Sequence, residues 1–103
     1  MTQNISDEAI RLLQKRLRIR FGMLLRKLRH QRKKKQYHFA AILGTSQAYV
    51  SNIEIGNTNL TLDQITKLLA KLNYELVLDV NPILTDNIHE LASSEKARKL
   101  LGL

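Results

Sequence analysis

The segment from Gln36 to Gly56, QYHFAAILGTSQAYVSNIEIG, constrains the fold most, because its helix breakers leave room only for two short helices joined by a sharp turn. The first helix is predicted over about 36–43, and Gly44 is well placed to end it. Thr45 or Ser46 begins the second, SQAYVSNIE. Helices this short are marginal alone, so they must pack against each other and against the rest of the chain.

The second of these helices is apolar on one side and polar on the other. Its apolar pair is Val50 and Ile53, whereas Gln47, Ser51 and Asn52 lie on the remaining surface. Glutamine and asparagine amides both donate and accept hydrogen bonds, which matches the N6 and N7 edge of adenine, and such a helix can enter a major groove. The alternative is an ordinary solvated helix face.

Further helices are predicted on both sides of this pair. Ser6 can cap a helix over about 6–32, which is either continuous or in two pieces that meet near Gly22. Its apolar residues recur every three or four positions: Ile10, Leu13, Leu17, Phe21, Leu24 and Leu28. Thr61 with Gln64 has the pattern of a capping box, which begins a last helix. The predicted core residues are Leu24, Leu28, Phe39, Ala40, Leu43, Val50, Ile53, Ile65, Leu68 and Leu72.

The period of the pattern changes after the last helix. Apolar and polar residues alternate in YELVLDV, which predicts a strand of about seven residues that Asn81-Pro82 ends. A single strand leaves backbone groups unpaired, so we expect a second copy of the chain to pair with it antiparallel across a two-fold axis. The predicted dimer contacts are Tyr74, Leu76, Val77, Leu78 and Val80, all but Val77 facing the helices. The alternative is an extended tail packed on its own domain.

The charge of the chain is high and unevenly placed. The formal net charge is +8 in 103 residues, and the stretch from Arg11 to Lys35 contains no Asp or Glu. Such a block repels itself unless an anion lies nearby, which indicates a polyanionic partner. Nucleic acid is the first candidate and a membrane surface the second, and a solvated basic face without a partner is the remaining interpretation.

The sequence offers little for catalysis or metal binding. It contains no cysteine, and its three histidines lack the spacing of metal ligands. Glu54 is the one acidic residue between Glu8 and Asp63, so no pair of carboxylates can form at the centre of the domain. There is no apolar run near 18 residues and no signal-peptide order at the N-terminus. We therefore expect a cytoplasmic protein that is not an enzyme and has no catalytic residue, cofactor, metal or membrane contact.

The central segment resembles the helix-turn-helix of the phage-repressor (Cro/Xre) family. The residues at the family's positions are Gln36, Phe39-Ala40, Gly44, Ser51, Glu54 and Gly56. The resemblance implies an all-α, lambda-repressor-like bundle of four to five helices, with the C-terminal β-strand pairing across a dimer. Its domains would be a basic helical extension (1–19), a DNA-binding domain (20–73), a dimerisation strand (74–81) and a tail (82–103).

The same resemblance implies roles for individual residues. Gln47, Ala48 and Asn52 would face bases, with Ala48 suited to a thymine methyl group. The remaining DNA contacts would be Lys34, Lys35, Gln36, Ser46, Tyr49, Ser51, Asn57 and Asn59, with Gln36 donating to a phosphate. Arg29 stands seven residues before Gln36, where the family has an arginine that forms an ion pair with the glutamate at position 54. A glycine often precedes that glutamine by three residues, but here the position holds Lys33, so either Lys33 has a positive φ or the first helix runs longer.

A narrower resemblance concerns function. SQAYVSNIE, followed by a last helix and a terminal strand, is similar to HipB antitoxins. This implies a homodimer that binds a palindromic double-stranded DNA operator, represses transcription and acts as antitoxin or regulatory subunit beside a HipA-like kinase toxin. The alternatives are a stand-alone phage-type repressor and a protein-binding adaptor that has lost DNA binding.

Overall fold

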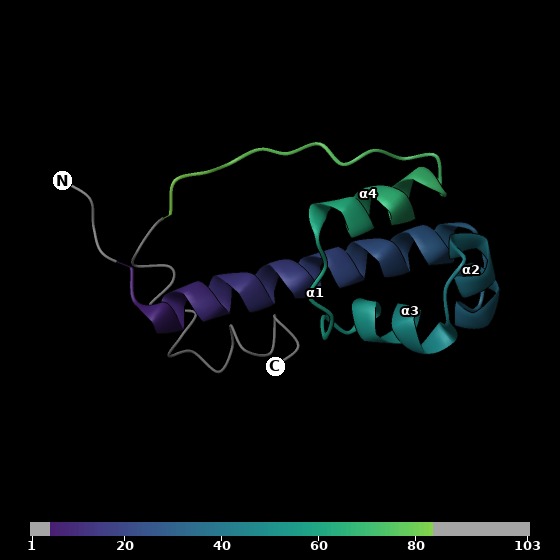
Figure 1. The fold of residues 1–103 in the computed structure, drawn as a ribbon, viewed down its shortest axis with the longest axis horizontal. Helices are drawn as coiled ribbons and strands as arrows, with labels where there is room; N and C mark the ends of the chain where they lie inside the picture. The colour runs from purple at the N-terminus through teal and green to yellow at the C-terminus, as the bar shows by residue number, and fades with distance from the viewer. Residues whose placement is uncertain (1–4, 84–103) are drawn as a thin grey trace.

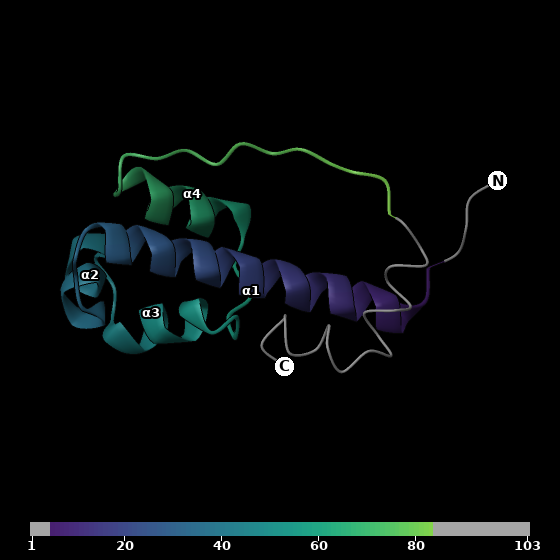
Figure 2. The same cartoon turned by 180° about the vertical axis from the view of Figure 1, so that it is seen from behind.

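The computed structural model describes residues 5–83 of the chain. Within that range it contains the helices α1 (Asp7–Gln31), α2 (Gln36–Leu43), α3 (Gln47–Glu54) and α4 (Leu62–Ala70), and no strand. In Figure 1, α2, α3 and α4 gather around the C-terminal half of α1, with α3 on one side of it and α4 on the other. Figure 2 shows the same grouping from behind. The expected helical bundle is confirmed.

Local sequence explains where α1 begins and why it does not break. Ser6 caps it, because the Ser6 hydroxyl accepts a hydrogen bond from the Ala9 amide at 3.1 Å. The helix is continuous through Gly22, so the first of the two alternatives, one unbroken helix, is the correct one. A Cβ at position 22 would overlap the carbonyl oxygen of Ile53 and lie 2.8 Å from that of Glu54. Glycine is therefore present because the end of α3 packs directly on the backbone of α1.

The core confirms the expected residues of α2 and α3 but corrects the face of α1. Phe39, Ala40, Leu43, Val50 and Ile53 are buried as predicted, together with Leu28, Leu68 and Leu72. Leu24, however, is 41% exposed, whereas its neighbour Leu25 is completely buried. Both residues fit a three-and-four spacing with Phe21 and Leu28, and the contact of Gly22 with α3 turns the Leu25 side inward.

The two turns around α2 use left-handed residues. Lys33 has φ 53°, so α1 does not run longer, and a lysine occupies the left-handed conformation that glycine usually takes. Gly44 has φ 70°, and the next amide, that of Thr45, donates to the Ala40 carbonyl at 2.9 Å. Ser46 then caps α3 through the Tyr49 amide. The sharp turn between α2 and α3 is confirmed.

The predicted capping box of α4 is present, and the chain beyond α4 is extended. The Thr61 hydroxyl accepts from the Gln64 amide at 3.1 Å, and the Gln64 side chain accepts from the Thr61 amide at 2.8 Å. After α4 the backbone runs back along the direction of α1 (Figure 1), and of its apolar side chains Leu76 packs against the core. Tyr74, Leu78 and Val80 are exposed in the single chain, so the paired strand stays a prediction. The expected tail lies, from residue 84 on, outside the described residues.

Candidate nucleic-acid interface

The side of α3 that points away from the bundle forms a compact polar surface. We call this the outer face of α3; it consists of Gln47, Ala48, Ser51, Asn52 and Ile55. Ser51 is half-buried and the other four side chains are exposed. On the opposite side of the same helix, Val50 and Ile53 are almost completely buried. The residues expected to read bases are therefore together on one accessible surface.

A buried carboxylate fixes the position of α3. Arg29 Nε donates to Glu54 Oε2 at 2.8 Å, and Arg29 Nη2 donates to Oε1 at 2.9 Å, which is the ion pair that the sequence predicts. Only 3% of the Glu54 side chain is exposed, against 11% for Arg29. Hydrogen bonding to Glu54 raises the pKa of the Arg29 guanidinium, although burial acts in the opposite direction. The two-pronged geometry holds both side chains in one orientation.

The same pair also holds the start of α2. Arg29 Nη1 donates to the carbonyl oxygen of Lys34 at 3.1 Å, and Gln36 Nε2 donates to Glu54 Oε1 at 3.3 Å. One carboxylate thus connects α1, α2 and α3, and no buried side-chain nitrogen or oxygen of the described residues lacks a hydrogen-bond partner. Gln36, expected at a phosphate, is half-buried and uses one amide hydrogen inside the protein. Its second amide hydrogen is the one that would donate a hydrogen bond to a phosphate.

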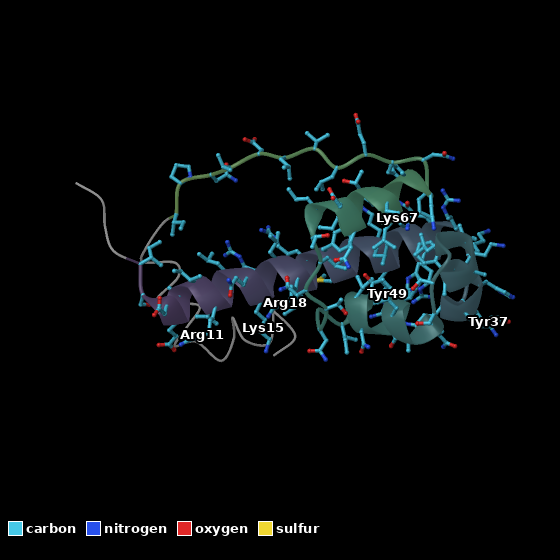
Figure 3. The ribbon with its side chains drawn as sticks, viewed as in Figure 1. Arg11, Lys15, Arg18, Tyr37, Tyr49 and Lys67 are labelled. Atoms are coloured by element: carbon cyan, nitrogen blue, oxygen red, sulfur yellow. The ribbon has the colours of Figure 1, made fainter. Side chains whose placement is uncertain are left out.

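The remaining predicted contacts lie around α3. Lys34, Lys35, Asn57 and Asn59 are exposed, the lysines before α2 and the asparagines in the loop after α3. The Ser46 oxygen serves as the cap of α3. Tyr49 is half-buried against the core and shares a groove with Gly44, Lys67 and Lys71, as Figure 3 indicates for Tyr49 and Lys67. The ring of Tyr49 is therefore at the edge of the outer face rather than on it.

Several residues with a part in the site were missed at the sequence level. Ile55 is 65% exposed at the end of the outer face, where an apolar side chain can contact a thymine methyl group. Arg32 Nη2 donates to the Leu72 carbonyl at 2.7 Å, and Lys71 Nζ donates to the Leu43 carbonyl at 2.7 Å. These two bonds connect α4 to α1 and α2. The pattern offered a signal only for Ile55, which falls outside the Val50–Ile53 stripe.

Other kinds of site are not found in residues 5–83. No three His, Asp or Glu side chains in that range gather as a metal site requires. None of the described helices combines the length and the apolar character of a membrane span.

Comparison with known families agrees with this geometry. A family profile described as helix-turn-helix matches residues 25–78, just over half of the chain. This chain belongs to the Cro/C1-type helix-turn-helix family. In the terms of that family, α2 and α3 form the helix-turn-helix and α3 is its recognition helix, so the protein is a DNA-binding regulator. Searches among curated proteins and among solved structures gave no match.

Proposed function

We propose that the protein is a transcriptional repressor that reads a palindromic double-stranded operator with α3 and binds it as a homodimer. The outer face of α3, held by the Arg29–Glu54 pair, is the observation that carries this proposal. Gln47, Ala48 and Asn52 contact base edges, while Lys34, Lys35 and Asn57 contact phosphates and set the register. Other members of the contact set are Gln36, Ser46, Tyr49, Ser51 and Asn59.

Base reading is tested with a duplex that the protein itself selects from a random pool. Gln47→Ala is expected to weaken binding to the selected duplex by about 1–3 kcal/mol and to leave a scrambled duplex almost unchanged. Gln31→Ala, which removes an exposed glutamine at the far end of α1, is the matched control. Fluorescence anisotropy measures both. Equal losses on the two duplexes for Gln47→Ala would show that this residue does not read bases.

The homodimer is supported by the extended segment after α4. Val77 is 82% exposed, Leu78 69% and Val80 88%, and the segment pairs with no other described part of its own chain. Pairing of two copies through Tyr74, Leu76, Val77, Leu78 and Val80 satisfies backbone groups along the shared edge and lets side chains on the same face of the two strands pack against each other. Val77→Pro is expected to give folded monomers, whereas Val77→Ala stays dimeric. Sedimentation measures both, and a folded Val77→Pro dimer would exclude this contact.

A role as antitoxin or regulatory subunit of a HipBA-type toxin–antitoxin module is the finer part of the proposal. It is supported by the likeness of SQAYVSNIE and of the segment after α4 to HipB antitoxins. We expect the adjacent reading frame to encode a kinase, and we expect that kinase to co-purify with this chain. A stand-alone phage-type repressor would bind the operator without such a partner, and an adaptor would bind no selected duplex at all.

A further inference from the structure

The half of α1 that extends beyond the bundle carries a row of cations on a defined side. Arg11, Lys15 and Arg18, which we call the basic stripe, are spaced by four and three residues and so share one helix face. Continuing the same spacing leads to Gly22, Leu25 and Arg29. Gly22 and Arg29 contact α3 directly. The basic stripe therefore points to the side of α1 on which α3 lies, as Figure 3 shows.

The stripe begins where the loop after α3 meets α1. Gly56 packs on Ile19, since a Cβ at position 56 would lie 2.6 Å from Ile19 Cγ1. Arg18 lines a groove with Thr58 and Asn59 of the same loop. Lys15 and Arg11 follow at about one and two further turns of α1, away from α3, over about 10 Å in total. The loop expected to contact phosphates and the basic stripe thus meet at Arg18, around a groove that Leu17 and Leu60 also line.

The cations of the stripe are available to a partner. Arg11 and Lys15 are exposed and Arg18 is half-buried. No carboxylate of residues 5–83 forms an ion pair with any of the three, because the ion pair found in that range is Arg29–Glu54. With no carboxylate of residues 5–83 paired to them, three cations in one row repel each other, and an anion with regularly spaced charges relieves that repulsion.

We propose that the basic stripe binds the phosphate backbone of the same duplex whose major groove receives α3, beyond the C-terminal end of α3. A B-DNA major groove is about 8.5 Å deep, so a recognition helix inside it has the sugar–phosphate backbone rising beside it toward the level of α1. Arginine and lysine side chains are long enough to bridge the remaining gap. This inference rests on the proposed function, because it requires α3 to be in the groove. The stripe extends the footprint and adds affinity without adding sequence preference.

The test compares two triple variants with the same loss of charge. The first is Arg11→Gln with Lys15→Gln and Arg18→Gln; the control is Arg16→Gln with Arg20→Gln and Lys27→Gln, which lie on the opposite side of α1. The slope of log affinity against log salt concentration is measured by anisotropy on the selected and the scrambled duplex. The stripe variant is expected to lose about 2–3 from the slope, roughly 0.9 for each phosphate contact, and to weaken on both duplexes by the same factor. The control is expected to lose less than about 1.

A shortened duplex locates the contact. Removing the base pairs under the N-terminal half of α1 is expected to weaken the wild-type protein to the level of the stripe variant and to leave that variant unchanged. Equal slopes for the two triple variants, or no loss for the stripe variant, would overturn the inference while leaving base reading by α3 intact. Failure of the wild-type protein to bind any duplex would instead overturn the proposed function. Circular dichroism checks the helix content, and the three single glutamine variants, each expected to lose about 1 from the slope, give the same decision if the triple variant is unfolded.

Discussion

The two halves of α1 have similar patterns but different surroundings. Both halves repeat apolar residues every three or four positions and both are rich in cations. In the C-terminal half, Leu25 is fully buried and Arg29 is bound to Glu54, whereas in the N-terminal half Ile10 is 41% and Leu17 68% exposed. Among the described helices the difference follows from length, because α3 and α4 have eight and nine residues against twenty-five in α1 and do not reach its first turns. Periodicity shows which side of a helix is apolar, but not whether anything covers it.

The largest expected effect is in the buried ion pair of the C-terminal half. Glu54→Ala is expected to lower the free energy of unfolding by about 3–5 kcal/mol, because it leaves the almost buried guanidinium of Arg29 without a charged partner. Glu8→Ala, an acidic residue in the first turn of α1, is expected to change it by less than about 0.5 kcal/mol. Urea unfolding measures both. A double-mutant cycle with Arg29→Ala is expected to show strong coupling, and additive effects would mean that the pair contributes nothing specific.

Two leucines of the same helix compare the halves directly. Leu25→Ala is expected to cost about 2–5 kcal/mol, since it opens a cavity in the core. Leu17→Ala removes the same atoms from a side chain that is 68% exposed, and its expected cost is below about 0.5 kcal/mol. Thermal unfolding at a concentration that keeps the chain monomeric is the measurement. Similar losses for both leucines would contradict the division of α1 into a half on which α3 and α4 pack and a half that they do not reach.

Gly22 marks the first close contact between α1 and α3. Adding a methyl group there is expected to destabilise the protein by about 1–3 kcal/mol, because the new Cβ overlaps backbone atoms of α3. In an uncovered helix the same change stabilises by about 1 kcal/mol, so the sign of the effect distinguishes the two situations. Chemical denaturation of Gly22→Ala gives the answer, and a gain in stability would place α3 farther from α1.

The smallest expected effect is at the C-terminal end of the covered half. Lys33 has φ 53°, and Lys33→Gly is expected to raise the free energy of unfolding by about 0.5–1 kcal/mol by relieving the left-handed backbone. Lys34→Gly is the matched control; it removes the same charge outside that conformation and is expected to give no gain. A stabilised Lys34→Gly would trace the effect to charge rather than to the backbone.

Local signals predicted most of the fold and part of the site. Ser6, Gly44 and the Thr61–Gln64 box lie where short-range hydrogen bonding places them, so the ends of the helices could be predicted from neighbouring residues alone. The choice between Leu24 and Leu25 could not, because it depends on the contact between α1 and α3.

The site, like the fold, has a part that local sequence predicts and a part that depends on contacts between distant residues. The polar positions of α3 follow from its period, but the groove of Tyr49 and the bonds of Arg32 and Lys71 to distant carbonyls join residues far apart in the sequence. No pattern of spacing within one helix contains that information.

Because α1 is unbroken, the number of residues between two of its positions determines the direction in which their side chains point. Because one continuous helix joins Arg18 to Gly22, inserting a single residue directly after Arg18 would rotate everything before it by roughly 100° and shift it by about 1.5 Å. The bundle would fold as before, yet the cations at positions 11, 15 and 18 would point away from α3. In this helix a change of length, more than a change of residue type, can redirect a surface without disturbing the core.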